Sequence, residues 1–320
     1  MHALITGGAG FIGSHLAERL LRKGQKVTLL DDLSTGRREN ITHLLNNPEC
    51  TLVEGSIRDE TLISRLVGAC DQVFHLAAAV GVQLIVDRPV HTIETNIHGS
   101  EVVLAAAAAA KRKILLASSS EVYGKSTAVP FSEDDDMVYG CTKLNRWLYA
   151  ASKAIDEFLA LAYHRERDLP VIVVRLFNTI GPRQRGSYGM VVPRFVKSAL
   201  AGEPLNVYGD GSQTRCFCDV ADVVAAFDGL MAESRAVGEV INVGADSPIS
   251  IETLARRVIT LTSSDSNIKF VPYHEAYGPH FDDLMIRQPA LDKITRLIGY
   301  RPSYSLDQTL GRIIEWAKEN

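Results

Sequence analysis

The sequence lacks any strong excess of charge of one sign. Its 34 Lys and Arg residues nearly balance 38 Asp and Glu residues, giving a net charge of −4 over 320 residues. Nucleic acids and anionic membrane surfaces are normally bound through a concentration of basic side chains. The balance therefore argues against both as partners, and a small acidic substrate would have to be held by local basic residues.

Cysteine is scarce, and long apolar runs are missing. The five cysteines form an odd set without a CxxC pair, which is a poor basis for a zinc site and predicts incidental thiols in a reducing cytoplasm. The N-terminus does not show the charged and then apolar regions of a secretory leader. The alanine tract at 105–110 is flanked by charged residues, so it predicts a buried helix rather than a membrane span. We expect a cytoplasmic protein without a metal.

The first half of the chain alternates short β-branched runs with helical patterns. This alternation is typical of βαβ units and predicts an α/β protein with a doubly wound parallel Rossmann sheet. Strands are predicted at 2–6, 26–30, 51–54, 72–76, 113–117 and 171–175, and helices at 11–22, 59–67, 89–110 and 146–167. After residue 181 the elements become shorter and less regular. We therefore predict one domain at 1–180 and a smaller C-terminal α/β part at 181–320, with a soft boundary between them.

The first predicted strand runs into Gly7, Gly10 and Gly13 at the start of a helix. In such a turn the first glycine permits a tight bend, the second lets the backbone approach a pyrophosphate, and the third lets the helix pack on the strand. Asp31 follows at the end of the next strand, where a carboxylate accepts the ribose hydroxyls of a dinucleotide. Its charge disfavours a 2′-phosphate, so the pattern favours NAD over NADP, although two nearby arginines weaken that preference. A plain glycine-rich turn with a solvated aspartate is the alternative.

Further segments resemble the extended short-chain dehydrogenase/reductase family along nearly the whole chain. They are Asp31-Asp-Leu-Ser-Thr-Gly36, His75-Leu-Ala-Ala78, Thr95-Asn-Ile-His-Gly99, Ser118-Ser-Ser-Glu-Val-Tyr-Gly124, a YxxxK pair and Arg175-Leu-Phe-Asn178. The resemblance implies NAD contacts from Gly7, Gly10, Phe11, Ile12, Gly13, Asp31, Asp32, Ser34, Thr35, Gly36, Ser56, Ile57, Leu76, Ala77, Ala78, Thr95, Ala117, Tyr149, Lys153 and Thr179. At Ser56 the family usually has an aspartate near the adenine, so that contact is a hydroxyl or is weaker here.

Two YxxxK pairs, Tyr139 with Lys143 and Tyr149 with Lys153, are available. The chemistry needs the lysine near the phenol on one helical face, because an unperturbed tyrosine has a pKa of about 10 and is a poor base at neutral pH. The first pair looks like the family's YGxSK string, but the second begins an uninterrupted helical pattern. Residues 146–153 also resemble the RWxYxxSK segment of the decarboxylase domain in the polymyxin-resistance sugar pathway. We predict that Tyr149 and Lys153 are catalytic and that Tyr139 lies in the loop before the helix.

Residues next to the predicted catalytic serine separate the reactions of this family. Ser119 matches the position that hydrogen-bonds the sugar hydroxyl and the phenol; the alternative is that this serine only caps a strand end. Sugar 4,6-dehydratases resemble one another in having Thr-Asp-Glu here, and simple 4-epimerases usually lack the carboxylate. Ser119-Ser120-Glu121 instead resembles UDP-glucuronate decarboxylases, which also carry an arginine in an RxP segment. Arg287-Gln-Pro289 supplies one.

The resemblance implies a UDP-glucuronate decarboxylase. Such an enzyme oxidises C4 of the sugar with NAD, loses the C5 carboxylate through an enolate, and returns the hydride to give UDP-xylose. Glu121 would destabilise the carboxylate or manage a proton, while Ser120 and Arg287 would position it; a solvated Glu121 and a surface Arg287 remain open. The alternatives are a UDP-glucuronate or UDP-hexose 4-epimerase, which keeps the carboxylate, and a non-catalytic NAD-sensing protein.

The diphosphate of a nucleotide sugar needs cations, and arginine suits bidentate phosphate binding. By resemblance, Arg215 is a diphosphate contact and Asn178 is a substrate asparagine. Arg185 and Arg194 belong to segments that normally form the sugar-nucleotide pocket. The resemblance thus makes residues 1–180 the NAD-binding domain and residues 181–320 the nucleotide-sugar-binding domain.

The predicted helices at 89–110 and 146–167 carry small and apolar residues around much of their circumference. In this family such helices typically form a four-helix dimer interface. The resemblance therefore implies a homodimer, and burial of these helices within one subunit is the alternative.

Overall fold

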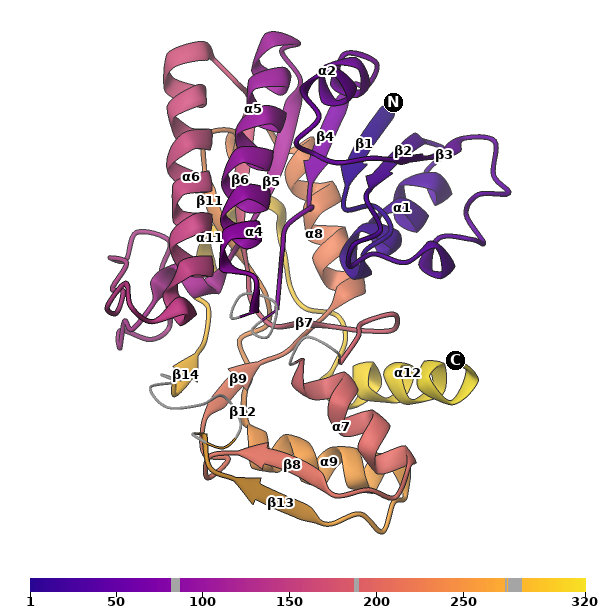
Figure 1. Cartoon of the computed structure of the whole chain (residues 1–320), viewed down its shortest axis with the longest axis vertical. Coiled ribbons are helices and arrows are strands. Elements are labelled where there is room, and N and C mark those ends of the chain that lie inside the picture. Colours follow the sequence, from indigo (N-terminus) through magenta and orange to yellow (C-terminus); the bar gives the residue numbers. More distant parts are fainter. Residues whose placement is uncertain (82–86, 187–189, 274, 276–283) are drawn as a thin grey trace.

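The computed structural model describes residues 1–81, 87–186, 190–273, 275 and 284–320. A seven-stranded sheet lies at its centre, with the strand order β11-β6-β5-β4-β1-β2-β3 (Figure 1). Every neighbouring pair in it is parallel. Its strands are β1 (His2–Thr6), β2 (Lys26–Asp31), β3 (Cys50–Glu54), β4 (Gln72–His75), β5 (Lys113–Ser119), β6 (Val171–Leu176) and β11 (Val240–Val243). The predicted doubly wound α/β fold is confirmed.

Helices cover both faces of this sheet because its strands are apolar on both sides. One face packs against α1 (Phe11–Arg22) and α8 (Val220–Ala232), and the other packs against α2 (Glu60–Gly68), α5 (Gly99–Ala109) and α6 (Leu148–Arg167). Figure 1 shows α5 and α6 running side by side. Two separate hydrophobic cores result, one on each side of the sheet.

Two predicted helices differ from the observed ones. The helix predicted at 89–110 is divided into α4 (Pro89–Ile93), a π-helical turn (Glu94–His98) and α5. Such turns inside helices are frequent at functional sites. In this turn the fully buried Asn96 accepts a hydrogen bond from the Ala79 backbone N–H at 2.8 Å. The helix predicted to begin at residue 146 begins at Leu148, after a short 3₁₀ turn at Asn145–Trp147.

The C-terminal part forms a smaller α/β layer below the large sheet in Figure 1. Its small sheets have the orders β12-β9-β14, β13-β8 and β10-β7. The strands are β7 (Thr179–Ile180), β8 (Leu205–Tyr208), β9 (Thr214–Cys216), β10 (Cys218–Asp219), β12 (Pro248–Ser250), β13 (Ile268–Val271) and β14 (Ile286–Arg287). The helices are α7 (Val191–Leu200), α9 (Ile251–Thr262) and α12 (Leu306–Glu319), and they enclose a third hydrophobic core.

Some elements that follow residue 180 belong to the large sheet or pack against it. Strand β11 pairs with β6, from Val240 opposite Val173 to Val243 opposite Leu176, and so covers the edge of the large sheet. Helix α8 packs on α1, and α11 (Asp292–Ile298) packs on β11 and α8. We propose that these later elements complete the NAD-binding domain, and that the remainder of 181–320 forms the second domain.

None of the helices in the described part of the chain has the length and apolarity required to cross a bilayer.

Candidate active site

A cavity of about 650 Å³ lies where the two parts of the chain meet. Its lining includes Gly7 after β1, Asp31 at the end of β2 and Ser119 at the end of β5. The carboxyl ends of parallel strands meet at one edge of a sheet, and ligands of open α/β sheets bind there. The opposite wall includes Arg194 from α7 and Arg287 from β14. The structure therefore brings the two predicted groups of site residues to one cavity.

The glycine-rich turn allows close packing around the start of α1. Gly7 has a φ of +70°, and a Cβ on it would lie 2.9 Å from the Ala77 backbone nitrogen. A Cβ on Gly13 would lie only 2.2 Å from the Gly7 carbonyl oxygen. Gly10 is the N-cap residue of α1 and has no side chain to offer the first amides of the helix. Those amides therefore face the cavity as donors for an anionic group such as a pyrophosphate.

Asp31 is held rigidly at the end of β2. Its carboxylate accepts hydrogen bonds from the backbone N–H groups of Ala9 and Leu33, both at 2.9 Å. Burial raises the pKa of Asp31, and these two hydrogen bonds lower it. Gly36 lets the following loop pass close by, because a Cβ there would lie 2.6 Å from Asp31 Oδ1. The remaining lone pairs of the carboxylate can accept ribose hydroxyls.

The other predicted cofactor residues also gather at the cavity, with two exceptions. Gly36 supports Asp31 and does not line the cavity. Ser56 lies between two lining residues, and its hydroxyl accepts a hydrogen bond from the Arg58 backbone N–H at 3.2 Å. Those that line the cavity are Gly7, Gly10, Phe11, Ile12, Gly13, Asp31, Asp32, Ser34, Thr35, Ile57, Leu76, Ala77, Ala78, Thr95, Ala117, Tyr149, Lys153 and Thr179.

Tyr149 and Lys153 lie on α6, are both buried, and line the cavity beside Ser119. Burial raises the pKa of Tyr149; the negative charges of Glu121 and Asp156 raise it further, and a hydrogen bond with Ser119 lowers it. The Ser119 hydroxyl also accepts a hydrogen bond from the Glu121 backbone N–H at 3.2 Å. The predicted serine, tyrosine and lysine thus share one corner of the cavity.

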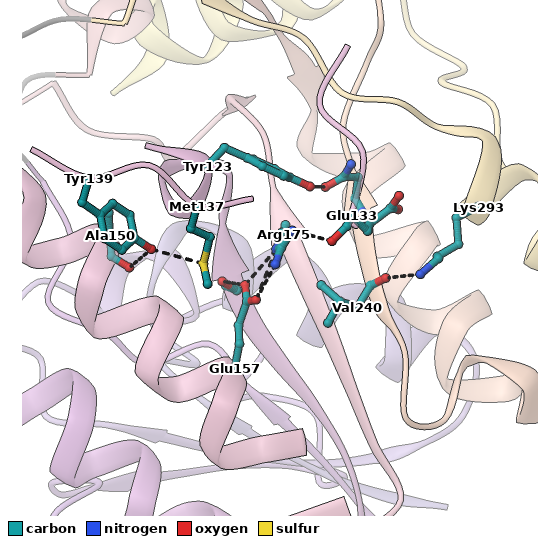
Figure 2. Close-up of polar contacts among 11 residues, drawn as sticks. Tyr123, Glu133, Met137, Tyr139, Ala150, Glu157, Arg175, Val240 and Lys293 are labelled. Carbon is teal, nitrogen blue, oxygen red and sulfur yellow. Dashed lines mark hydrogen bonds and ion pairs between the residues drawn. The ribbon is translucent and has the colours of Figure 1, made fainter. Parts of the chain in front are cut away.

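The rival pair lies elsewhere. Tyr139 lies in the loop before α6, as expected, and its hydroxyl contacts Met137 Sδ at 3.3 Å and the Ala150 carbonyl oxygen at 3.5 Å (Figure 2). Lys143 is exposed in the same loop. Neither residue lines the cavity, so the geometry favours Tyr149 and Lys153.

Arg287 and Glu121 form an ion pair in the cavity wall. The Arg287 side chain is 9% exposed and the Glu121 side chain 15%. Within the described residues, Arg287 Nε is a buried donor without a hydrogen-bond partner. Ser120 is also buried and lines the cavity. The alternative of a solvated Glu121 and a surface Arg287 is therefore wrong.

The remaining predicted substrate residues also line the cavity: Asn178, Arg185, Arg194 and Arg215. The Arg194 guanidinium lies 4.1 Å from the centre of the Tyr208 ring. Asn178 Oδ1 is a buried acceptor without a partner in the part of the chain that the structure describes. Sequence reasoning missed several further lining residues, which are Arg88, His91, Arg183, Tyr208, Gln213 and Tyr273. Gln213 and Arg183 each lie two residues before a predicted arginine, Arg215 and Arg185, whereas the others carry no local signal.

The chain matches known proteins along nearly its whole length. The family model described as GDP-mannose 4,6 dehydratase matches residues 4–313. The chain belongs to the extended short-chain dehydrogenase/reductase family. A UDP-N-acetyl-alpha-D-glucosaminuronate decarboxylase of Bacillus cytotoxicus is 44% identical over 99% of this chain and 97% of its own length. UDP-glucuronic acid decarboxylase 2 of Arabidopsis thaliana is 36% identical over 98% of this chain and 68% of its own.

Solved structures of the family are similar throughout. The epimerase Mth375 of Methanothermobacter thermautotrophicus has a TM-score of 0.91 and 30% identity, covering 100% of this chain and 92% of its own. The dTDP-glucose 4,6-dehydratase DesIV of Streptomyces venezuelae, solved with NAD bound, has a TM-score of 0.90 and 30% identity, covering 100% and 98%. Different reactions therefore share this fold, and the site residues have to distinguish them.

A buried ion pair holds α6 against the sheet next to this site. Arg175 of β6 contacts Glu157 through Nε and Nη2, with distances of 2.8–3.2 Å, and donates to the Glu133 carbonyl oxygen at 3.0 Å (Figure 2). The Ser118 hydroxyl donates to Glu157 at 2.5 Å. Both charged side chains are about 95% buried. One carboxylate thus connects the residue before Ser119 with the helix turn after Lys153.

We predict that Glu157→Gln destabilises the protein by about 3–5 kcal/mol, because it leaves the Arg175 charge buried and incompletely paired. Glu239→Gln is the matched control: Glu239 pairs with Lys293 at 2.9 Å but is 44% exposed, so its loss costs less than about 1 kcal/mol. Urea unfolding of both variants measures the difference. Equal stabilities would contradict the role given to the buried pair.

Proposed function

We propose that the protein is an NAD-dependent UDP-glucuronate decarboxylase. It would oxidise the sugar at C4, release the C5 carboxylate as carbon dioxide and reduce C4 again to give UDP-xylose. The observation that carries this proposal is the buried pair of Arg287 and Glu121 in the same cavity as Ser119, Tyr149 and Lys153. The printed names of the Bacillus and Arabidopsis relatives support it.

NAD fits the residues at the carboxyl edge of the sheet. The amides at the start of α1 would hold the pyrophosphate, and Asp31 would hold the adenosine ribose. Arg38 is paired with Glu54 and is thus less available to a 2′-phosphate, which favours NAD over NADP. When bound, NAD would accept a hydride from C4 and would later return it to C4.

The proton of the C4 hydroxyl would pass to Tyr149, with Ser119 orienting the hydroxyl. In the protein alone, burial and two carboxylates raise the pKa of Tyr149, so the phenolate is disfavoured. The ammonium of Lys153, on the same helix, would supply a positive charge that opposes this effect. Tyr149 would return the proton when C4 is reduced again.

Decarboxylation would follow from the charges around the sugar carboxylate. Once C4 is a ketone, the bond from C5 to the carboxylate can break, and its electron pair remains on the sugar as an enolate. C5 of the enolate would then take up a proton from solvent, which regenerates the C4 ketone before it is reduced. Arg287 would hold the carboxylate with its unpaired Nε, and Ser120 would donate a hydrogen bond. Glu121 repels a second carboxylate at this place, so loss of that charge as carbon dioxide relieves the repulsion. A 4-epimerase keeps the carboxylate and so gains nothing from this repulsion.

A second candidate substrate is UDP-N-acetylglucosaminuronate. The 44% identical relative is named for this sugar, which differs from UDP-glucuronate at C2 and keeps the same groups at C4 and C5. The same residues would therefore perform the same decarboxylation.

Incubation of the purified protein with each UDP-uronate, with carbon dioxide trapped and products followed by NMR, tests the proposal. Carbon dioxide and UDP-xylose, or its 2-acetamido counterpart, are the expected products. UDP-galacturonate without carbon dioxide would identify a 4-epimerase. No turnover of any UDP-sugar would favour an NAD-sensing protein.

Tyr149→Phe is predicted to lower the rate of carbon dioxide release by about 10²–10⁴-fold, because the phenylalanine has no proton to exchange with the C4 hydroxyl. Tyr139→Phe is the control and is predicted to keep most of the activity, since Tyr139 does not line the cavity. Steady-state kinetics of both variants decides. Full turnover by Tyr149→Phe would contradict the assignment.

We also infer that the protein is a homodimer through a four-helix interface. Helix α4 packs beside α6, and the two helices expose large apolar side chains. These are Val90 (66% exposed), Ile93 (41%), Ile155 (46%) and Phe158 (61%). Such a group of exposed apolar residues favours a protein contact. A second copy of α4 and α6 would cover it.

Phe158→Glu is predicted to shift the protein to monomers, because it places a charge in this interface. Phe270→Glu is the control. Phe270 is 48% exposed but lies on β13 of the C-terminal layer, outside α4 and α6, so its replacement is expected to leave the dimer intact. Analytical ultracentrifugation at micromolar concentration measures both. A Phe158→Glu variant that stays dimeric would rule out this interface.

We further infer that the protein works in the cytoplasm. Its cysteines are free thiols, and all of them but Cys141 are buried. A reducing compartment preserves such thiols.

A further inference from the structure

The lysine proposed to act on the Tyr149 phenol is itself paired with a carboxylate. Lys153 Nζ donates to Asp156 Oδ2 at 3.0 Å, and the two side chains are 3% and 0% exposed. They lie three residues apart on α6 and therefore face the same side of the helix. The general requirement for a lysine beside a tyrosine does not call for this carboxylate. Its burial next to the ammonium needs a physical explanation, because a buried charge is costly unless it is paired.

A row of buried polar groups continues from Asp156 toward the first strand of the sheet. Burial raises the pKa of Asp156, while Lys153 and the nearby Ser100 hydroxyl of α5 lower it. Ser100 Oγ is hydrogen-bonded to His75 Nε2 at 3.2 Å, and His75 Nδ1 to Thr6 Oγ1 at 2.7 Å. Thr6 Oγ1 accepts a further bond from the Ala77 backbone N–H at 3.2 Å. Since Ala77 lines the cavity, this row connects Lys153 to the cofactor wall.

The charges that face Tyr149 and Lys153 come from several elements. Glu121 follows β5 and is paired with Arg287, and Glu157 on α6 is paired with Arg175. His75 on β4 is neutral, because burial and the Lys153 charge lower its pKa to about 3. Asp156 therefore contributes the carboxylate that directly contacts the ammonium. Its negative charge offsets the positive charge that would otherwise stabilise a phenolate at Tyr149.

We propose that Asp156 is a positioning residue for Lys153. Its carboxylate holds the Lys153 ammonium by a direct ion pair and offsets the positive charge that the ammonium exerts on the Tyr149 phenol. The phenol then stays protonated in the resting protein. Binding of a nicotinamide ribose and a sugar hydroxyl would supply new partners and draw the ammonium toward Tyr149. The catalytic consequence rests on the function proposed above, whereas the coupling between these three side chains does not.

Asp156→Asn tests the charge effect without a large change in shape. The pKa of Tyr149 in the NAD complex is measured by NMR titration of protein labelled with ¹³C at tyrosine Cζ. The Tyr149 signal is assigned as the one that is missing in Tyr149→Phe. Two helical turns place Asp156 about 10 Å from Tyr149, so removing its charge is expected to lower that pKa by about one unit. An unchanged or higher pKa would overturn the proposal. Asp156→Ala is the second variant, in case the amide NH₂ is not accommodated beside the ammonium.

Asp222→Asn is the matched control. Asp222 is a buried carboxylate that accepts hydrogen bonds from the Ser303 and Tyr304 backbone N–H groups and does not line the cavity. Its replacement is expected to leave the pKa of Tyr149 unchanged. An equal shift in this control would show a general effect of removing buried charge and would overturn the proposal.

A double-mutant cycle with Lys153→Met tests whether Asp156 acts through Lys153. Asp156→Asn is expected to strengthen NAD binding several-fold, measured by calorimetry, in the presence of Lys153, because the ammonium no longer has to leave a carboxylate to reach the nicotinamide ribose. It is expected to have no effect in the Lys153→Met background. The same change in both backgrounds would overturn the positioning role. Neither this measurement nor the NMR titration needs turnover. Absence of carbon dioxide release would therefore contradict the proposed function but not the role of Asp156.

The pH profile of carbon dioxide release gives the catalytic readout. If Tyr149 must lose its proton, a lower pKa moves the acid side of the kcat profile to lower pH by about one unit in Asp156→Asn. A purely structural defect would lower kcat at every pH and leave the profile in place, which would overturn the proposal.

Discussion

The site depends on the ion pair between Arg175 and Glu157, buried between β5, β6 and α6. Two desolvated charges are tolerated only when each is well paired, so the pair permits one register of the helix against the sheet. Glu157 also accepts the Ser118 hydroxyl, which fixes the end of β5 relative to the same helix. Ser119 and Tyr149 are consequently held together by groups that take no part in the chemistry.

Two cationic side chains that line the cavity are each paired with a carboxylate of the protein. Arg287 pairs with Glu121, and Lys153 pairs with Asp156. A ligand must therefore displace a carboxylate to bind either cation, and displacement of Glu121 leaves its negative charge in the cavity wall. This arrangement suits a reaction in which the substrate itself carries a carboxylate that has to be destabilised and lost.

Much of the site could be predicted from the sequence because its motifs are local. The glycine turn, Asp31 and the YxxxK spacing each depend on one strand, turn or helix, and their geometry follows from residue spacing alone. The choice of Tyr149 over Tyr139 also followed from a helical pattern. Lining residues such as Arg88 and Tyr273 were missed, because they reach the cavity from segments without a distinctive pattern.

The sequence by itself determined the parallel α/β fold and the glycine turn at the edge of the sheet, since both arise from short-range periodicity and backbone conformation. Tertiary structure alone decided which distant charges meet. Arg287 reaches Glu121 because β14 pairs with β9, and β11 returns to the first sheet although elements of the C-terminal layer both precede and follow it in the chain. Long-range pairing depends on the free energy of the whole packed chain, which no local pattern encodes.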